Sequence, residues 1–349
     1  MERRYRRYHW LEKLQLQVAS AASLAVVYII VWPYMRGSDP QGAMSFLANG
    51  SPQAILAFTA ALLLLAAVCA IVTVNIRPCA AMIALLIGLG GLSLRSGQMR
   101  SLLWDHNGQA GQLFWKMAIE VIVLAALVLL AEILISLLRA LITKLDPKLG
   151  WSDPLVGTRD SQTVIGIGSK PTDTTLLKWV WEAAVARAIV SALMVSAGRA
   201  AGKSAKTEGD ERNLGRTGSA TLVALILAVA LMTAFLRSAD RGQILFALVA
   251  SFFLAVLVAH QLFATRYAAM AWVLPMILAI CAYALAGSSA VAAGSQRWMD
   301  VRLYARILPI DWLTAGCGGA MLGYWVSSRL HETRCLEKRD NDEGVQQNV

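Results

Sequence analysis

The 349-residue sequence has few charged side chains for its length. Charged residues make up 15% of the chain and apolar residues 57%, whereas soluble domains average about 25% charged residues. This deficit excludes an ordinary water-soluble fold. Apolar runs of the ~20 residues needed to cross ~30 Å of hydrocarbon recur along the chain. The composition therefore predicts an all-α protein, a polytopic transmembrane helical bundle.

Histidine and cysteine are also scarce. The four histidines form no pair at i, i+4, and the five cysteines are scattered without C-x-x-C spacing. Zinc sites and disulfide frameworks need such spacings. The sequence therefore predicts no metal, no cofactor and no disulfide framework. The apolar runs contain no Ser/His/Asp or metal-ligand constellation, which favours a non-enzyme.

Basic residues outnumber acidic ones and give a net charge of +10. They cluster beside the apolar runs, as in MERRYRRYHWLEKL at residues 1–14, where contacts with anionic lipids are expected. This position favours a lipid bilayer as the partner and excludes nucleic acid. The run after residue 14 ends without a small-residue cleavage pattern, so we expect a retained first span and not a signal peptide.

The apolar runs predict eight spans, with both termini in the cytoplasm and the protein in the cell inner membrane. This arrangement places most Lys and Arg residues inside, as the positive-inside rule requires. In the alternative of nine spans, residues 176–198 also cross and Arg187 lies within the membrane. We expect 176–198 to form a membrane-surface helix instead. The eight expected spans are 16–35, 53–75, 79–94, 117–138, 217–236, 244–263, 268–293 and 307–326.

The two halves of the sequence resemble each other. The polar segment after the first span of each half carries Arg and Asp at the same spacing, as Arg36 with Asp39 and Arg237 with Asp240. The fourth span of each half then begins with an acid, Glu120 or Asp311. The pattern predicts a 4+4 internal repeat; the alternative is a chance alignment of Ala/Leu-rich helices. The expected divisions are 1–143, a central cytoplasmic linker at 144–216, 217–330, and a disordered cytoplasmic tail at 331–349.

Carboxylates inside the apolar runs are the main candidates for a solute or ion path. Glu120 and Asp311 fall in the first turns of their spans, where the positive end of the helix dipole favours a carboxylate. Glu132 lies near the middle of its span, so it must face protein or water, pair with a cation or carry a proton. Arg139 lies two turns away on nearly the same face, and Arg187 is a candidate partner only if 176–198 inserts.

Two other features fall near the ends of predicted spans. With Arg187, His260 is a further candidate for the solute or ion path. It lies one turn from the inner end of its span, where snorkelling also explains it. In the last span Ala315, Gly319 and Gly323 recur every fourth residue, a pattern typical of close helix packing within a bundle or between protomers.

These patterns favour a transporter-like protein that moves a small solute or ion between two four-span halves, with proton coupling through Glu132. The alternative is a non-catalytic scaffold or assembly subunit of a larger membrane complex, or a homo-oligomer. Sparse polarity within the membrane and the glycine pattern suit that alternative equally well.

Overall fold

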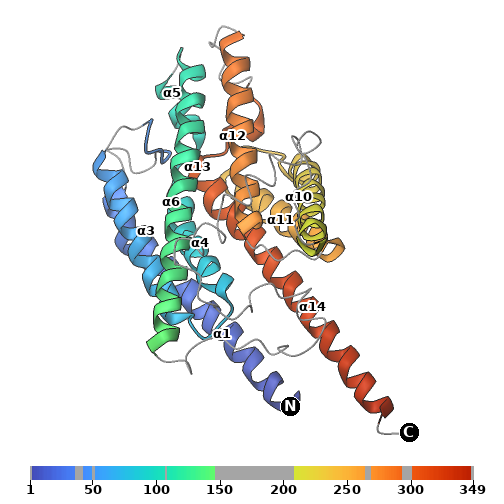
Figure 1. The fold of residues 1–349 in the computed structure, drawn as a ribbon. Helices are drawn as coiled ribbons and strands as arrows, with labels where there is room; N and C mark the ends of the chain where they lie inside the picture. Colours follow the sequence, from blue (N-terminus) through green and yellow to red (C-terminus); the bar gives the residue numbers. More distant parts are fainter. Residues whose placement is uncertain are drawn as a thin grey trace.

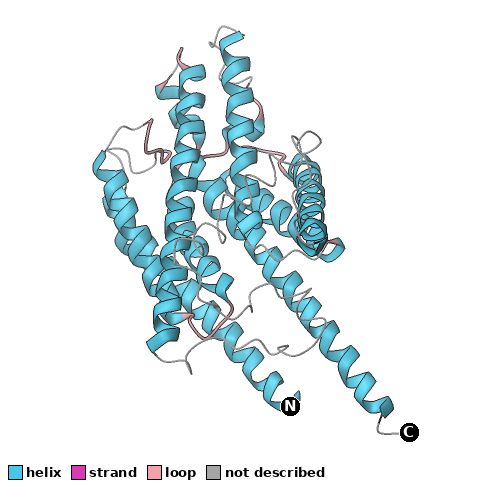
Figure 2. Cartoon of the chain, viewed as in Figure 1, coloured by secondary structure: helices cyan, strands magenta, loops and turns pink. Residues whose placement is uncertain are grey.

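The computed structural model describes residues 2–35, 42–48, 52–106, 108–145, 208–263, 269–292 and 301–346. Within these ranges the regular secondary structure is entirely helical, without a strand (Figure 2). A helix satisfies its backbone hydrogen bonds internally. A membrane span needs this because hydrocarbon offers no hydrogen-bond partners. Residues 176–198, including Arg187, lie outside the described ranges.

The first half of the chain forms four helical stretches. The first is continuous through α1 (Glu2–Val26), η1 (Val27–Val31) and α2 (Trp32–Met35). Pro52 and Pro78 open the second and third stretches, and each occupies a first-turn position where the helix needs no backbone N–H. The three that follow are α3 (Pro52–Val72), α4 (Pro78–Arg95) with α5 (Met99–Asp105), and α6 (Ala110–Leu145).

The second half begins with three long helices, α10 (Glu208–Phe235), α11 (Arg241–Leu262) and α12 (Ala269–Ala292). Pro275 lies inside α12, where proline removes a backbone hydrogen bond. The Cys317 thiol donates to the nearby Trp272 carbonyl at 3.1 Å. The chain ends with η3 (Leu303–Arg306), α13 (Pro309–Asp311), η4 (Trp312–Gly316) and α14 (Cys317–Gln346).

Six helices of the described ranges are long and apolar enough to cross a membrane, and a seventh span results if α4 and α5, bent by 55°, count as one. The chain is therefore a membrane protein with several spanning helices. Each of the eight sequence-predicted spans overlaps a helix of the described ranges, although not every one of these helices passes as a span by itself. The segment 307–326, however, lies on α13, η4 and α14 and is not among the six.

The core of the bundle is built around α4 and the start of α14. On α4, the side chains of Ala80, Ala81 and residues 83–86 are fully buried. Trp312 and Leu313 of η4 and Cys317 at the start of α14 are buried to the same degree. α4 and α14 lie against each other in opposite directions, with Ser93 bonded to Asp311 at one end and Arg77 paired with Glu332 at the other.

Pairs of parallel helices recur in both halves. α3 packs against α6. The two helices run in the same direction, because the segment before α3 contacts Glu120 and the residues after α3 contact Arg139, which lies later on α6. α11 runs beside α14, with Arg241 on Asp311 at the start and Gln261 bonded to Ser327 near the end. In each half, the second helix therefore packs beside the fourth and runs in the same direction.

The halves meet through a second kind of pair, in which neighbouring helices run in opposite directions. α12 packs along α6, with Trp272 bonded to Glu132 and Gly287 placed against Trp115. α4 packs against η4 and α14 in the same way. The outer helices are arranged differently, since α1 packs mainly on α4 whereas α10 packs mainly on α11 (Figure 1).

The end of the chain differs from the expected disordered tail at 331–349, because α14 is helical through Gln346. Glu332 is fully buried on this helix. It pairs with Arg77 and with Arg329, whose Nη1 lies 3.2 Å from the Glu332 carboxylate. These contacts fix the first turns of the tail. The start of α1, the end of α6 and the end of α14 lie at the same end of the molecule (Figure 1).

Candidate functional site

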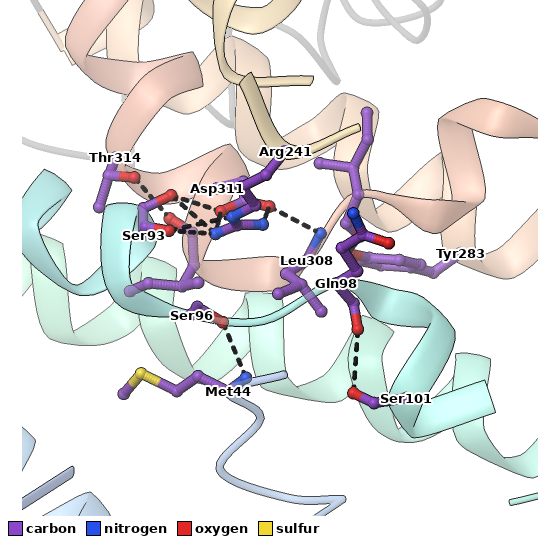
Figure 3. Close-up of polar contacts among 12 residues, drawn as sticks. Met44, Ser93, Ser96, Gln98, Ser101, Arg241, Tyr283, Leu308, Asp311 and Thr314 are labelled. Carbon is purple, nitrogen blue, oxygen red and sulfur yellow. Dashed lines mark hydrogen bonds and ion pairs between the residues drawn. The ribbon is translucent and has the colours of Figure 1, made fainter. Parts of the chain in front are cut away.

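Asp311 lies fully buried where the two halves of the chain meet. Pro309 begins α13 two residues earlier, which places the Asp311 carboxylate over the first turn, where it accepts the Leu308 N–H at 3.1 Å. Arg241 donates to both carboxylate oxygens at 2.5 Å, and the Ser93 hydroxyl donates to one of them (Figure 3). Such a bidentate pair is the strong form of an arginine–carboxylate contact.

Arg241 also joins this pair to the end of α4. Its Nε donates to the Ser93 carbonyl at 3.0 Å, and its Nη2 lies 3.2 Å from the Ser93 hydroxyl. Ser93 is two residues from the end of α4, where backbone carbonyls have no partner within the helix. The guanidinium therefore satisfies a helix end and a buried acid at once. Ser93 belongs to the first half, while Arg241 and Asp311 belong to the second.

Glu120 is buried near this cluster, on the first half's fourth helix, and is only 1% exposed. One oxygen accepts the Ser45 hydroxyl at 2.5 Å and the Leu47 N–H at 3.1 Å. The other oxygen has no hydrogen-bond partner among the described residues. Tyr283 of α12 lies near both Glu120 and Asp311, and its hydroxyl donates to the Ile307 carbonyl.

Glu132 is held by an indole from the other half of the chain. The Trp272 Nε1–H donates to its carboxylate at 3.0 Å. Arg139, the nearest cation along α6, points elsewhere and donates to the carbonyls of Thr73 at 2.7 Å and Val74 at 3.0 Å. The Glu132 contact therefore bridges the halves without a cation, about 18 Å along the helix from Glu120.

His260 lies at the opposite end of the bundle from Asp311. It is 4% exposed, and its Nδ1 lies 2.7 Å from the Ser327 hydroxyl. Its ring also meets the ring of Tyr324, with the centroids 4.8 Å apart. The side chain is thus enclosed by α14, whereas snorkelling would leave it at the helix surface.

The predicted glycine face of the last span lies against α11. A Cβ atom on Gly319 would lie 2.7 Å from the Val249 carbonyl oxygen, and one on Gly323 would come even closer to the Phe253 carbonyl. Ala315 belongs to the same stripe and is half-buried. The two helix backbones therefore approach each other closely, as the spacing of small residues suggests.

Among the sequence-predicted candidates, Asp311 and Glu120 lie near each other. Glu132 and His260 lie apart from them, and Arg187 is outside the described ranges. Sequence reasoning missed Arg241, Ser93, Trp272 and Tyr283 as contributors. Arg241 had a detectable signal, because it opens an apolar run just as Asp311 does and a charge at that position needs a partner.

A cavity of about 410 Å³ opens beside the Arg241–Asp311 cluster. The turn between α4 and α5 and the first residues of α5 form one wall, and the segment before α11 and the end of η3 form the other. Its lining residues are Gln98, Met99, Arg100 and Leu103 on the first wall, and Ala239, Asp240 and Arg306 on the second.

Within the described part of the chain, no group of three or more His, Cys, Asp or Glu side chains is placed to hold a metal ion. Comparison with known proteins finds no matching family model, no matching curated protein and no matching solved structure. The functional argument therefore rests on the geometry of this chain.

Proposed function

We propose that the protein is transporter-like and moves a small solute or ion between two four-span halves, residues 1–143 and 217–330. One observation carries this proposal: two of the polar contacts described above bridge the halves. Ser93 meets Arg241 and Asp311 across the junction, and Glu132 meets Trp272. Polar groups within a membrane are costly and tend to mark solute or proton paths.

The helix pairs support an internal 4+4 repeat as the basis of the two halves. In each half the second helix runs parallel to the fourth, and the third helix of each half packs antiparallel to the fourth helix of the other. A two-fold relation between halves generates such exchanged pairs. Glu120 and Asp311 then occupy equivalent positions, each bonded to a serine hydroxyl and a backbone N–H. The outer helices α1 and α10 depart from this relation.

The proposed topology keeps eight spans in the cell inner membrane, with α4 and α5 as the third and residues 307–326 as the eighth. Both termini and the linker at 144–216 are assigned to the cytoplasm. The common end shared by the start of α1 and the ends of α6 and α14 supports this assignment (Figure 1). Basic residues near that end, including those at 1–14, suit anionic lipids of an inner leaflet.

A scaffold role is the alternative function, and a partner subunit or second copy would then dock on the bundle. The glycine stripe at 315–323 offers such a partner little, because its backbone already lies against α11. The polar contacts between the halves would also hold a scaffold together, but polar groups inside a membrane tend to mark solute or proton paths. The geometry therefore favours transport.

The transport proposal predicts that Glu132→Gln slows proton-coupled flux without lowering the yield of folded protein. Glutamine keeps an oxygen that can accept the Trp272 N–H but cannot release a proton at neutral pH. Purified protein would be reconstituted into liposomes that contain a pH-sensitive dye, and a pH gradient would be imposed. We expect wild-type liposomes to equilibrate faster than protein-free ones and Glu132→Gln liposomes to fall toward the protein-free rate.

Trp272→Phe provides the matched control for this experiment. It removes the hydrogen-bond donor and keeps most of the ring packing, so it changes how Glu132 is positioned and leaves the titratable carboxyl group in place. Normal yield with wild-type flux in Glu132→Gln would exclude this carboxyl group from the path.

A further inference from the structure

Two ion pairs among the described residues cross between the halves, near the end of the bundle where α1 begins and α14 ends (Figure 1). Arg77, which directly precedes α4, pairs with Glu332 on α14, the helix that continues the last span of the second half. Arg329, one turn earlier on α14, pairs with Glu12 of α1. Parting the halves at this end would therefore separate opposite charges.

The opposite end of the junction is closed in a different way. There Arg241 and Asp311 both belong to the second half, and Ser93 of α4 meets them from the first. The ion pair itself would stay intact if the halves parted at that end, and only the contacts to Ser93 would be lost. α4 is therefore tied to the second half at both of its ends, through Ser93 at one and through Arg77 at the other.

The α14 segment that carries the crossing charges is fastened to its own half. The Gln261 side chain at the end of α11 donates to the Ser327 carbonyl at 3.1 Å. The Arg334 Nη1 donates in turn to the Gln261 side-chain oxygen at 3.0 Å. Residues 327–334 should therefore move with the second half as one body, toward or away from their charged partners in the first half.

Ion pairs suit a contact that opens to water. Burying two charges costs hydration free energy comparable to the attraction between them, and water that enters an opening gap returns this hydration to each charge. Apolar surface exposed by the same movement would instead be penalised by water. The side chains of Arg77 and Glu332 are 7% and 0% exposed, so they regain the most hydration on opening. Paired charges can therefore close the junction and still allow reversible opening.

We propose that Arg77, Glu332, Arg329 and Glu12 form a gate that closes this end of the path between the halves. The inference rests on the proposed function, because it names the residues that control access to that path. Opening of the gate parts Arg77 from Glu332 and Arg329 from Glu12, while the Ser93 contacts at the opposite end stay closed. The path then opens to one side at a time, as alternating access between two halves requires.

Two natural buried cysteines can report whether this end opens. Cys79 is 7% exposed and lies near Arg77 and Arg329. Cys317 is fully buried at the start of α14, farther along the helix from the gate. Full-length chains that keep only one of these two cysteines would be placed in lipid nanodiscs, where both faces meet solvent. They would be treated with a charged methanethiosulfonate that does not enter lipid, and labelling would be followed by mass spectrometry.

We expect Cys79 to react about tenfold or more faster in Arg77→Gln and in Glu332→Gln than with the gate intact, the effect of losing a charge-assisted contact. A local effect of charge cannot produce this result. Loss of a cation and loss of an anion change the reactivity of a nearby thiol in opposite directions, whereas opening of the gate accelerates the reaction in both variants. Cys317 should keep its rate.

Glu337→Gln is the matched control, because Glu337 is exposed on the same helix and the substitution removes the same charge as Glu332→Gln. We expect it to leave the Cys79 rate unchanged. An unchanged Cys79 rate in both gate variants would overturn the gate, as would equal acceleration by Glu337→Gln. Equal acceleration at Cys317 would overturn it as well, because the ion pairs would then hold the whole fold together and not one end of the junction.

The labelling needs no flux, so the two proposals fail separately. Gate-dependent labelling of Cys79 in a protein that transports nothing overturns only the transport proposal. Transport that depends on Glu132, together with a Cys79 that is equally unreactive in every variant, overturns only the gate.

Discussion

Asp311→Ala is expected to lower the free energy of unfolding by about 3–5 kcal/mol, because it leaves a buried cation without its partner. The Arg241 guanidinium lies between α4 and α13 with both of its terminal nitrogens on the Asp311 carboxylate. Alanine also removes the acceptor of the Ser93 hydroxyl and the Leu308 N–H. The junction between the halves would therefore lose several contacts at once.

Denaturant unfolding in mixed micelles, followed by tryptophan fluorescence, measures this effect. The control is Asp240→Ala, which removes an exposed acid bonded locally to Ser238 and should cost about 1 kcal/mol or less. Replacing both partners, as Arg241→Met with Asp311→Leu, should recover much of the loss because no buried charge then remains. Equal losses for Asp311→Ala and Asp240→Ala would contradict the burial of the pair.

Gly319→Ala and Gly323→Ala are expected to destabilise the bundle by about 1–3 kcal/mol each, through overpacking. The nearest atoms to an added methyl group belong to the α11 backbone at Val249 and Phe253. A backbone cannot rotate away as a side chain can, so α11 and α14 must separate. We expect Gly323→Ala to have the larger effect because its contact is closer.

Gly318→Ala is the matched control for these substitutions. An added Cβ there meets only the Leu86 Cβ, at 3.9 Å, which is an ordinary contact. Alanine should then stabilise the helix by up to about 1 kcal/mol through its higher propensity. The measurement is the same unfolding titration. If alanine at 318 and at 319 had the same effect, the close approach of α11 would be wrong.

The positions of the helices could be predicted from the sequence because runs of apolar residues have few alternatives in a membrane. The small-residue spacing at 315–323 likewise indicated a close helix contact. It was harder to predict from the sequence which face of each helix contacts protein and which contacts lipid. α4 is apolar and buried on most sides, yet a lipid-facing helix such as α3 has the same composition. Composition alone does not distinguish hydrocarbon from protein as the surroundings.

The partners of the buried acids could not be predicted either. Glu132 meets Trp272, which is 140 residues away in the sequence, and no local pattern specifies which face of α12 turns toward α6. The position of Asp311 suggested a carboxylate stabilised by the helix dipole, whereas the structure encloses it between α4 and α11 and pairs it with Arg241. The helical tail was missed because Glu332 is stabilised by Arg77, a contact that exists only after folding.

The accessibility of the junction to water tests the central claim most directly. In a chain whose five natural cysteines are replaced, Glu132→Cys and Leu130→Cys would be treated in native membranes with a small water-soluble thiol reagent. Glu132 lies on the contact between the halves, whereas Leu130 is 45% exposed on the outer surface of the same helix. We predict that the cysteine at 132 reacts while the one at 130 is protected by lipid. A cysteine at 132 as unreactive as that at 130 would show a sealed junction and contradict a solute path between the halves.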